Sequence, residues 1–161
     1  MAGTPDLTNP YYDAHRLAGE EVSSTGEGRH INVKESNIGA YPVHADGHVH
    51  KGDPVALFDA VGVALKTGSS PTFSDVIPVD TEGIWRLSVT NTGLNNFGTI
   101  VPGQVLFIGG NGVITDHWVG GYGYSIFGFA LQPIDSVRTE VIAVKVHWMY
   151  PYWFYDPVIG P

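Results

Sequence analysis

Alternation of apolar and polar side chains in two segments is the feature that most constrains the fold of this chain. In TEVIAVKVHW (139–148), apolar residues occupy every even-numbered position from 142 onward, and in IWRLSV (84–89), Trp85, Leu87 and Val89 alternate with polar residues. A period of two places each apolar set on one face of a β-strand, whereas an amphipathic helix repeats every 3.6 residues. We therefore expect two strands that each bury one face.

Glycine and proline favour the same fold class. The chain has 21 Gly and 11 Pro among 161 residues and only 15% charged residues, a balance typical of short strands joined by tight turns. The apolar segments 105–108 and 113–115 flank the sequence GGNG, and an Asn-Gly pair readily supplies the positive φ of a hairpin turn. A domain of this size needs no disulfide to stabilise its core, and the chain contains no cysteine.

These patterns predict an all-β protein with one compact, barrel-like or sandwich-like domain at residues 46–148. Residues 1–45 are expected to form an N-terminal arm: Asn9 and Pro10 can start a short helix, but 20–30 offer few apolar side chains to bury. Residues 149–161 form a Pro-containing aromatic tail. We expect the arm to become ordered only with a partner.

A weak internal repeat divides the domain. KGDPVALF (51–58) is followed by GVAL (62–65), and PGQVLFIG (102–109) is followed later by GFAL (128–131). The small residues in the second strand of each unit would let another strand approach closely. Two related β units would produce this pattern, and so would chance similarity among strands rich in Gly and Val.

The segment DTEG precedes the strand predicted at 84–89. It is typical of a polar hairpin turn, with Gly83 at a position of positive φ.

Charge excludes one class of partner. Sixteen acidic against eight basic residues give a formal charge of −8, so a nucleic acid backbone would be repelled on average. No window approaches the ~20 apolar residues of a membrane span, and MAGTPDLTNP lacks the regions of a secretion signal. We expect a soluble protein that is made in the cytoplasm and binds neither nucleic acid nor membrane.

Four segments follow one another in an order that resembles bacteriophage capsid decoration proteins of the DUF2190 type. They are GDPVALFDAVGVAL (52–65), VIPVDTEGIWRLSV (76–89), PGQVLFIGGNGVIT (102–115) and FGFALQPIDSVRTEVIAVKVHW (127–148). The resemblance implies a tulip-like β domain that trimerises at local threefold sites on the outer surface of a phage head. It also implies that the major capsid protein is the partner, and that the role is to stabilise the virion without catalysis. The longer arm and tail depart from such a domain, so their contacts do not follow from the resemblance.

Three histidines form the strongest candidate for a chemical site. His44, His48 and His50 lie beside Asp46 and Asp53, and imidazole and carboxylate groups at short spacing can hold Zn²⁺, Ni²⁺ or Fe²⁺. In a strand, the three even-numbered positions would share one face, as in a small cupin-like metal enzyme. The alternative is a solvated hairpin without metal, in which the histidines could titrate near neutral pH.

Sequence motifs for catalysis are weak. Ser125 lacks a GxSxG context, and the glycines at 120, 121 and 123 do not complete a phosphate-binding pattern. Asp116 and His117 are adjacent and would point to opposite faces of a strand. We therefore predict no catalytic residue and no cofactor.

The tail is the most unusual segment of the chain. Six aromatic residues fall within eight positions, and Pro151 and Pro157 disfavour a helix there. The tail could fold back on its own domain, dock on a neighbouring subunit or the capsid, or form a sugar-binding or receptor-binding platform with Trp118. The residues predicted for such contacts are Tyr11, Tyr12, Trp148, Tyr150, Tyr152, Trp153, Phe154 and Tyr155.

Overall fold

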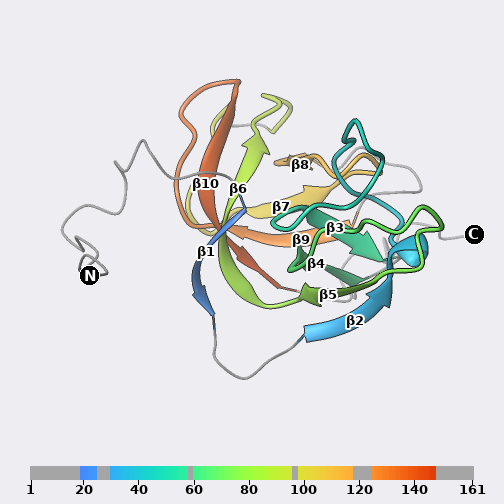
Figure 1. Ribbon diagram of the computed structural model, residues 1–161. Coiled ribbons are helices and arrows are strands. Elements are labelled where there is room, and N and C mark those ends of the chain that lie inside the picture. Colours follow the sequence, from blue (N-terminus) through green and yellow to red (C-terminus); the bar gives the residue numbers. More distant parts are fainter. Residues whose placement is uncertain (1–18, 25–29, 58–59, 96–97, 118–124, 148–161) are drawn as a thin grey trace, which may run out of the picture.

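The computed structural model describes residues 19–24, 30–57, 60–95, 98–117 and 125–147, which form a nearly all-β structure (Figure 1). The strands are β1 (Glu20–Ser24), β2 (His30–Lys34), β3 (Pro54–Leu57), β4 (Ala60–Ala64), β5 (Val76–Asp80), β6 (Gly83–Thr90), β7 (Val105–Ile108), β8 (Ile114–Thr115), β9 (Ser125–Ala130) and β10 (Thr139–Val146). Within these ranges the only helical element is the 3-10 turn η1 (Glu35–Asn37). None of the described helical structure is long or apolar enough to cross a membrane. The predicted fold class is confirmed.

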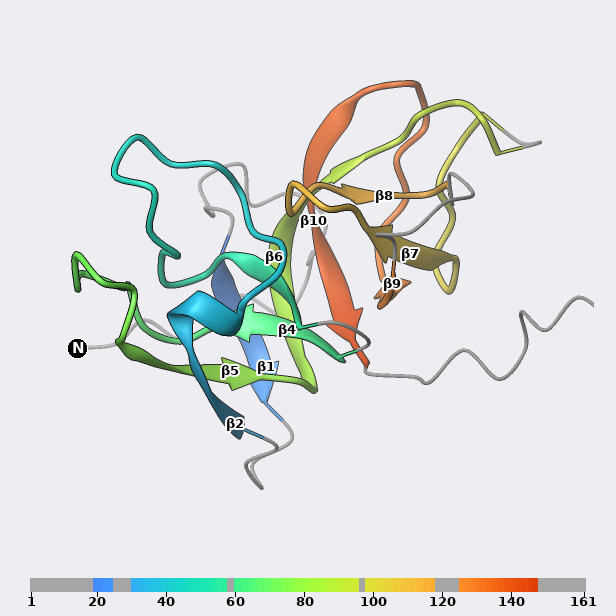
Figure 2. The ribbon, with the colours of Figure 1, turned by 90° about the vertical axis from the view of Figure 1, so that its right-hand side faces the viewer.

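The first sheet closes into a barrel. Its order is β1-β6-β10-β9-β7-β8, and β8 also pairs in parallel with β6 through Val89↔Ile114 and Thr90↔Thr115. The ring β6-β10-β9-β7-β8 is therefore complete, and β1 pairs with the first half of β6 outside it. Figure 2 shows this ring beside the smaller second sheet.

The apolar core fills the barrel. Trp85, Leu87 and Val89 of β6 are buried, as are the three even-numbered apolar residues of β10 from 142 to 146. Both alternations therefore direct their apolar faces inward, as predicted. Burying such a side chain contributes about 1.5–3 kcal/mol. The buried residues of β6 and β10 belong to one core cluster with buried residues of β7, β8 and β9, so the barrel and its core form together.

The second sheet begins earlier in the chain than predicted. Its order is β2-β5-β4-β3, and the outer side of β3 is covered by a bridge between Ala40 and Ala56. Ile38 and Ala40 are buried, and Ile31 and Val33 pack against the cluster under this sheet. Residues 30–45 thus belong to the domain, and the predicted boundary at 46 was too late. Only two apolar residues alternate in β2, so the sequence signal there was weak.

The internal repeat is a structural one. In each unit a Gly turn precedes two antiparallel strands, and the registers correspond: Val55 pairs with Gly62 in β3–β4, and Leu106 pairs with Gly128 in β7–β9. The backbone bonds correspond as well. Gly52 N–H donates to the Ala64 carbonyl at 2.7 Å, and Gly103 N–H donates to the Ala130 carbonyl at 2.7 Å.

The correspondence continues into the third strand of each unit. Leu65 N–H donates to the Pro78 carbonyl of β5 at 2.8 Å, and Leu131 N–H donates to the Ala143 carbonyl of β10 at 2.9 Å. The units β3-β4-β5 and β7-β9-β10 therefore share one topology and one hydrogen-bond register. Chance similarity of Gly- and Val-rich strands would not place equivalent donors on equivalent acceptors.

The hairpin of β7 and β8 is confirmed by the antiparallel pairs Phe107↔Thr115 and Ile108↔Ile114, with Gly112 at φ 72°. The prediction for DTEG was wrong. Asp80 ends β5 in the second sheet and Gly83 begins β6 in the first, so the segment crosses between sheets.

Sterics rather than a positive φ account for the glycine at 83. Gly83 is not among the glycines with positive φ. A Cβ there would collide with the Asp80 carboxylate and the Trp85 indole. These two groups are hydrogen-bonded, because Trp85 Nε1 donates to Asp80 Oδ2 at 2.9 Å.

The repeated glycines yield a prediction. A Cβ at Gly62 would collide with Val79 and the Asp80 carbonyl, and one at Gly128 with the Lys145 carbonyl. Gly62→Ala and Gly128→Ala should each lower the free energy of unfolding by about 1–3 kcal/mol, because backbone must move to admit the methyl group. Gly110→Ala, with nothing within 4 Å of its added Cβ, is the matched control. Urea denaturation measures all three, and equal midpoints would contradict the steric account.

Candidate functional site: a histidine loop on a buried glutamate

The histidine loop, residues 41–53, connects the Ala40 bridge to β3. It is not a strand but contains two turns, with Gly47 at φ 74° and Gly52 at φ 92°. Gly47 N–H donates to the His44 carbonyl at 3.1 Å and closes the first turn. The even-numbered histidines therefore do not share one face, and the geometry expected from a strand was wrong.

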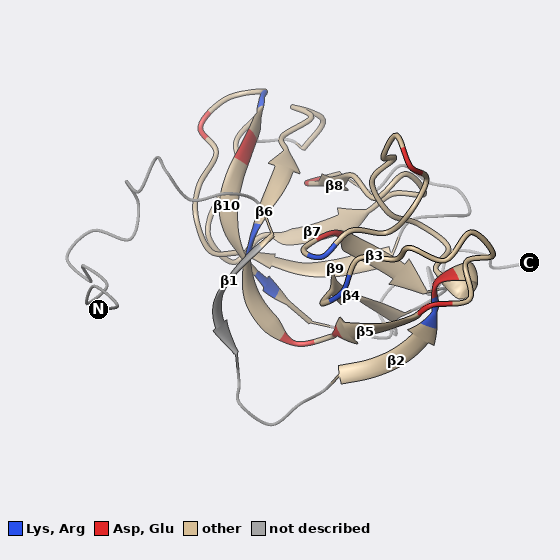
Figure 3. Cartoon of the chain, in the orientation of Figure 1, with Lys and Arg blue, Asp and Glu red and all other residues tan. Residues whose placement is uncertain are grey.

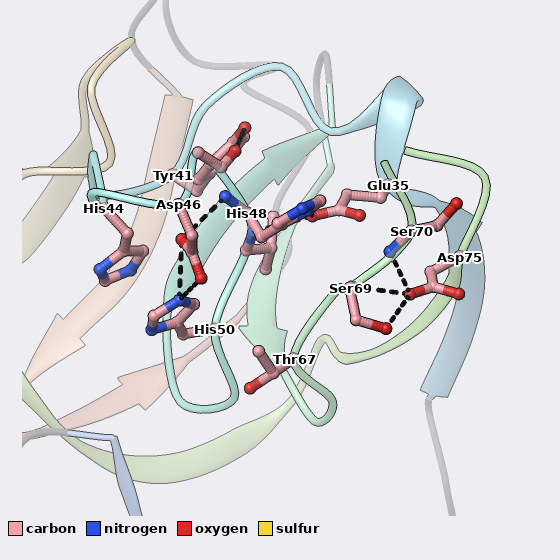
Figure 4. A network of polar contacts seen from close by, with 12 residues as sticks. Glu35, Tyr41, His44, Asp46, His48, His50, Thr67, Ser69, Ser70 and Asp75 are labelled. Atoms are coloured by element: carbon pink, nitrogen blue, oxygen red, sulfur yellow. Dashed lines mark hydrogen bonds and ion pairs between the residues drawn. The ribbon is translucent and has the colours of Figure 1, made fainter. Parts of the chain in front are cut away.

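Two of the histidine rings stack on each other, and each contacts its own carboxylate. The centroids of His44 and His50 are 3.7 Å apart with an interplanar angle of 2°. His44 Nε2 lies 2.7 Å from Asp53 Oδ2, and His50 Nε2 lies 3.0 Å from Asp46 Oδ2. Figure 4 shows the contact between His50 and Asp46. Each carboxylate can therefore offset the charge of the ring it contacts when that ring is protonated.

The third histidine faces a buried acid. His48 Nδ1 lies 3.0 Å from Glu35 Oε1, which also accepts the Val49 N–H at 2.9 Å. The Glu35 side chain is fully buried, and its Oε2 has no hydrogen-bond partner among the described residues. A buried carboxylate is costly unless it is hydrogen-bonded, and the His48 ring and the Val49 N–H are the groups in contact with Glu35 Oε1.

Backbone atoms pack against the Glu35 carboxylate on the side of Gly68. Gly68 lies directly against the carboxylate, because a Cβ there would collide with it. The Gly68 N–H donates to the Val49 carbonyl at 2.8 Å. Phe73, whose ring centroid lies 4.8 Å from that of His48, adopts φ 52°. Such a conformation persists in a non-glycine residue only where its surroundings fix it. Here Ser36 N–H donates to the Phe73 carbonyl at 3.0 Å.

Acidic charge dominates the electrostatics of the loop. Hydrogen bonds from the His50 side chain and the His48 N–H lower the pKa of Asp46 below its ordinary 3.8. Burial, followed by the negative charges of Glu35, Asp46 and Asp53, raises the pKa of Tyr41. Tyr41 therefore stays a neutral donor, and its hydroxyl donates to the Gly47 carbonyl at 2.8 Å.

A similar arrangement holds the neighbouring turn. The Ser69 N–H and hydroxyl and the Ser70 N–H donate to Asp75 Oδ2 (Figure 4). The Ser69 hydrogen bonds lower the pKa of Asp75 most.

The predicted metal ligands are not brought together. His44 and His50 contact different aspartates, and His48 contacts Glu35. Among the described residues, no group of three or more His, Asp or Glu side chains is arranged to hold a metal ion. The cupin-like alternative therefore lacks its ligand set in this part of the chain. Sequence reasoning missed Glu35 and Gly68, which lie in polar segments with no periodic pattern.

The turn before β7 in the second repeat unit corresponds to the last turn of the histidine loop, but it has an apolar residue where the loop has a histidine. Asp53 Oδ2 accepts the His50 N–H at 2.7 Å in the first unit, and Gln104 Oε1 accepts the Val101 N–H at 3.1 Å in the second. A pocket of about 620 Å³ opens at the second turn. Its lining residues are Leu94, Asn95, Val101, Pro102, Gly103, Gln104 and His117.

Asp116 and His117 do not act together. Asp116 is buried, and its Oδ1 accepts the Thr92 N–H at 2.8 Å and the Thr92 hydroxyl at 2.9 Å. His117 instead lines the pocket.

Several predicted contact residues lie outside the described ranges. They are Tyr11, Tyr12, Trp118, Trp148, Tyr150, Tyr152, Trp153, Phe154 and Tyr155. Comparison with protein-family models and with curated proteins finds no match to this chain. The resemblance to capsid decoration proteins therefore stays a prediction from the sequence.

The lowered pKa of Asp46 is directly testable. A lowered folded-state pKa contributes stability that is present above the unfolded value and is lost as pH falls through the folded value. An NMR titration should therefore place the Asp46 midpoint below 3.8 and return it toward 3.8 in His50→Ala, since His50 is the largest cause. His30→Ala, outside the loop, is the control. An unchanged midpoint in His50→Ala would refute this account.

Proposed function

We propose that this protein decorates and stabilises the outside of a mature phage capsid. It acts as a structural protein, binding as a homotrimer at local threefold sites of the major capsid protein. The observation that carries the proposal is a group of exposed apolar side chains on the loops at one end of the barrel. The order of the four sequence segments supports the same role.

This surface, called here the apolar rim, comprises Leu94, Val101, Pro102 and Val137. The exposed fractions are 63% for Leu94, 51% for Val101 and 65% for Val137. Leu94 and Val101 line the same pocket, and a Cβ at Gly93 would collide with Val137, so the members are neighbours. Apolar side chains gathered on the surface indicate a protein contact.

Charge indicates that the contact is between copies of this chain. A formal charge of −8 opposes self-association over most of the surface. The described part of the connection between β6 and β7 carries no Lys, Arg, Asp or Glu, as Figure 3 shows. Along that connection two copies would bury apolar area with little repulsion, whereas Val137 lies between the exposed Asp135 and Arg138. The acidic remainder suits an exterior location, away from packaged DNA.

The physical basis of stabilisation is linkage. A protein that binds only the expanded shell stabilises that state by its binding free energy. A trimer touches several capsid subunits at once, so modest contacts act together through high effective concentration. The fold needs only to present several contact surfaces on a rigid support, which the closed barrel provides.

Substitution at the rim tests the trimer. Val137→Asp should shift the protein from trimer toward monomer, because each contact would bury an unpaired carboxylate. Val43→Asp is the matched control, since Val43 is 88% exposed on the histidine loop. Analytical ultracentrifugation at micromolar concentration measures both. A monomeric parent protein, or equal oligomeric states of the two variants, would count against the proposal.

Capsid binding tests the role itself. Expanded heads mixed with the purified protein should gain density at local threefold positions in electron micrographs, and unexpanded heads should not. Val43→Asp should bind as the parent does, and Val137→Asp should bind less. Absence of the parent protein from expanded heads would overturn the proposal.

A further inference from the structure

We propose that the pocket beside the turn before β7 binds a small, uncharged heteroaromatic molecule with a hydrogen-bond donor and an acceptor side by side on one edge. The pocket measures about 620 Å³, within the range of about 300–1,000 Å³ that is typical of ligand sites. The internal repeat supplies the argument, because the equivalent turn of the first unit holds a planar ring. The inference does not depend on the proposed capsid role.

The two turns have the same backbone. Their glycines, Gly52 and Gly103, adopt φ 92° and 87°. In each turn the residue after the glycine donates its N–H to the carbonyl two residues before the glycine, at 3.0 Å in the first unit and 3.1 Å in the second. The carbonyl of the residue after the glycine then accepts an N–H from the next strand of the unit, at 2.9 Å in both. Val101 therefore stands where the first unit has His50.

In the first unit a ring lies beside this turn. His44 stacks on His50, with ring centroids 3.7 Å apart and an interplanar angle of 2°, and its Nε2 lies 2.7 Å from Asp53 Oδ2. One residue of the turn thus contacts the face of the ring, and another contacts its edge. Gln104 corresponds to Asp53, and it lines the pocket together with Val101. The pocket therefore borders the same two positions that hold the ring in the first unit.

The loop before the second turn is fastened differently. Asn95 lies six residues before the start of its turn, as His44 does in the first unit. The Asn95 side chain is bonded within its own loop, because its Oδ1 accepts the Gly98 N–H at 2.7 Å and its Nδ2 donates to the Thr99 carbonyl at 2.9 Å. Asn95 therefore forms part of the pocket lining, whereas His44 reaches across to its turn.

The side chain at the turn selects the edge of the ligand. Gln104 Oε1 accepts the Val101 N–H at 3.1 Å, which orients the amide and directs its Nε2 away from that bond. A carboxamide offers an acceptor and a donor side by side, as in the pairing of Gln with N7 and N6 of adenine. An ionised carboxylate such as that of Asp53 only accepts. The second unit therefore fits a ring that both donates and accepts, whereas the first holds a ring that donates.

The rest of the lining suits the faces of an uncharged ring. Leu94, Val101 and Pro102 are apolar, and His117 adds a polar group. The described lining residues include no Lys, Arg, Asp or Glu. A formal charge of −8 on the chain also disfavours an anion here. A neutral heterocycle therefore fits better than its phosphorylated form. The three apolar residues belong to the apolar rim, so the ligand would lie within that surface.

Adenine is a suitable probe because it is planar and neutral and has a donor and an acceptor on one edge. An NMR titration of the isotope-labelled full chain should shift the backbone N–H signals of Gly103 and Gln104 and the side-chain amide of Gln104. Adenosine monophosphate should bind more weakly than adenine because of its charge. Val137→Asp is titrated in parallel, so that a pocket covered by a second copy is still reached. Absence of these shifts in both proteins overturns the proposal.

Substitution of Gln104 tests the edge. Gln104→Glu keeps an acceptor for the Val101 N–H and removes the Nε2 donor, so adenine should bind about tenfold or more weakly. Imidazole should bind Gln104→Glu more tightly than the parent, because a carboxylate accepts the N–H of that ring. Asn111→Asp is the matched control: it introduces the same charge and keeps the acceptor for the Val113 N–H. Equal adenine affinities of Gln104→Glu and the parent overturn the proposal, and so does an equal loss in Asn111→Asp.

Discussion

The structure depends on the closure of one sheet by a strand of two residues. Ile114 and Thr115 pair with β7 on one side and with β6 on the other, and without them β7 and the second half of β6 would be open edges among the described strands. Closure determines which side chains face inward along every strand of the ring. It also fixes the loops at that end, because Asn91, directly after β6, is fully buried and donates to the carbonyls of Gly98 and Ser136. The position of the apolar rim therefore follows from closure.

The two repeat units share one pattern of backbone hydrogen bonds but carry different side chains at their turns. The same turn carries His50 and Asp53 in the first unit and Val101 and Gln104 in the second. In the first unit, carboxylates and imidazoles hold a long loop against the buried Glu35. In the second, the corresponding corner opens onto an uncharged pocket. A shared hydrogen-bond register lets the side chains diverge because the strands are held by backbone and by the glycines at 62 and 128.

This division of roles suits a protein that works by binding. The histidines are paired separately with Glu35, Asp46 and Asp53, so their contacts fix the shape of a loop. The exposed apolar side chains of the rim remain available to another chain. The histidine loop leads into β3 of the second sheet, whereas the rim lies on the β6–β7 and β9–β10 connections of the barrel.

Four features could be predicted from the sequence alone: the fold class, the inward faces of β6 and β10, the β7–β8 hairpin and the outline of the repeat. These features depend on local periodicity and on turn residues, which are written in consecutive positions. Sequence reasoning failed for the start of the domain, where β2 has only two alternating apolar residues. It also failed for DTEG, where the contact between the Asp80 carboxylate and the Trp85 indole leaves no room for a Cβ at position 83.

The contact of His48 with Glu35 and the stacking of His44 on His50 follow only from the three-dimensional fold. Those contacts depend on turns at Gly47 and Gly52 and on a 3-10 turn elsewhere in the chain, and no spacing in the sequence encodes them. The apolar rim likewise joins two loops whose neighbourhood arises only when the barrel closes.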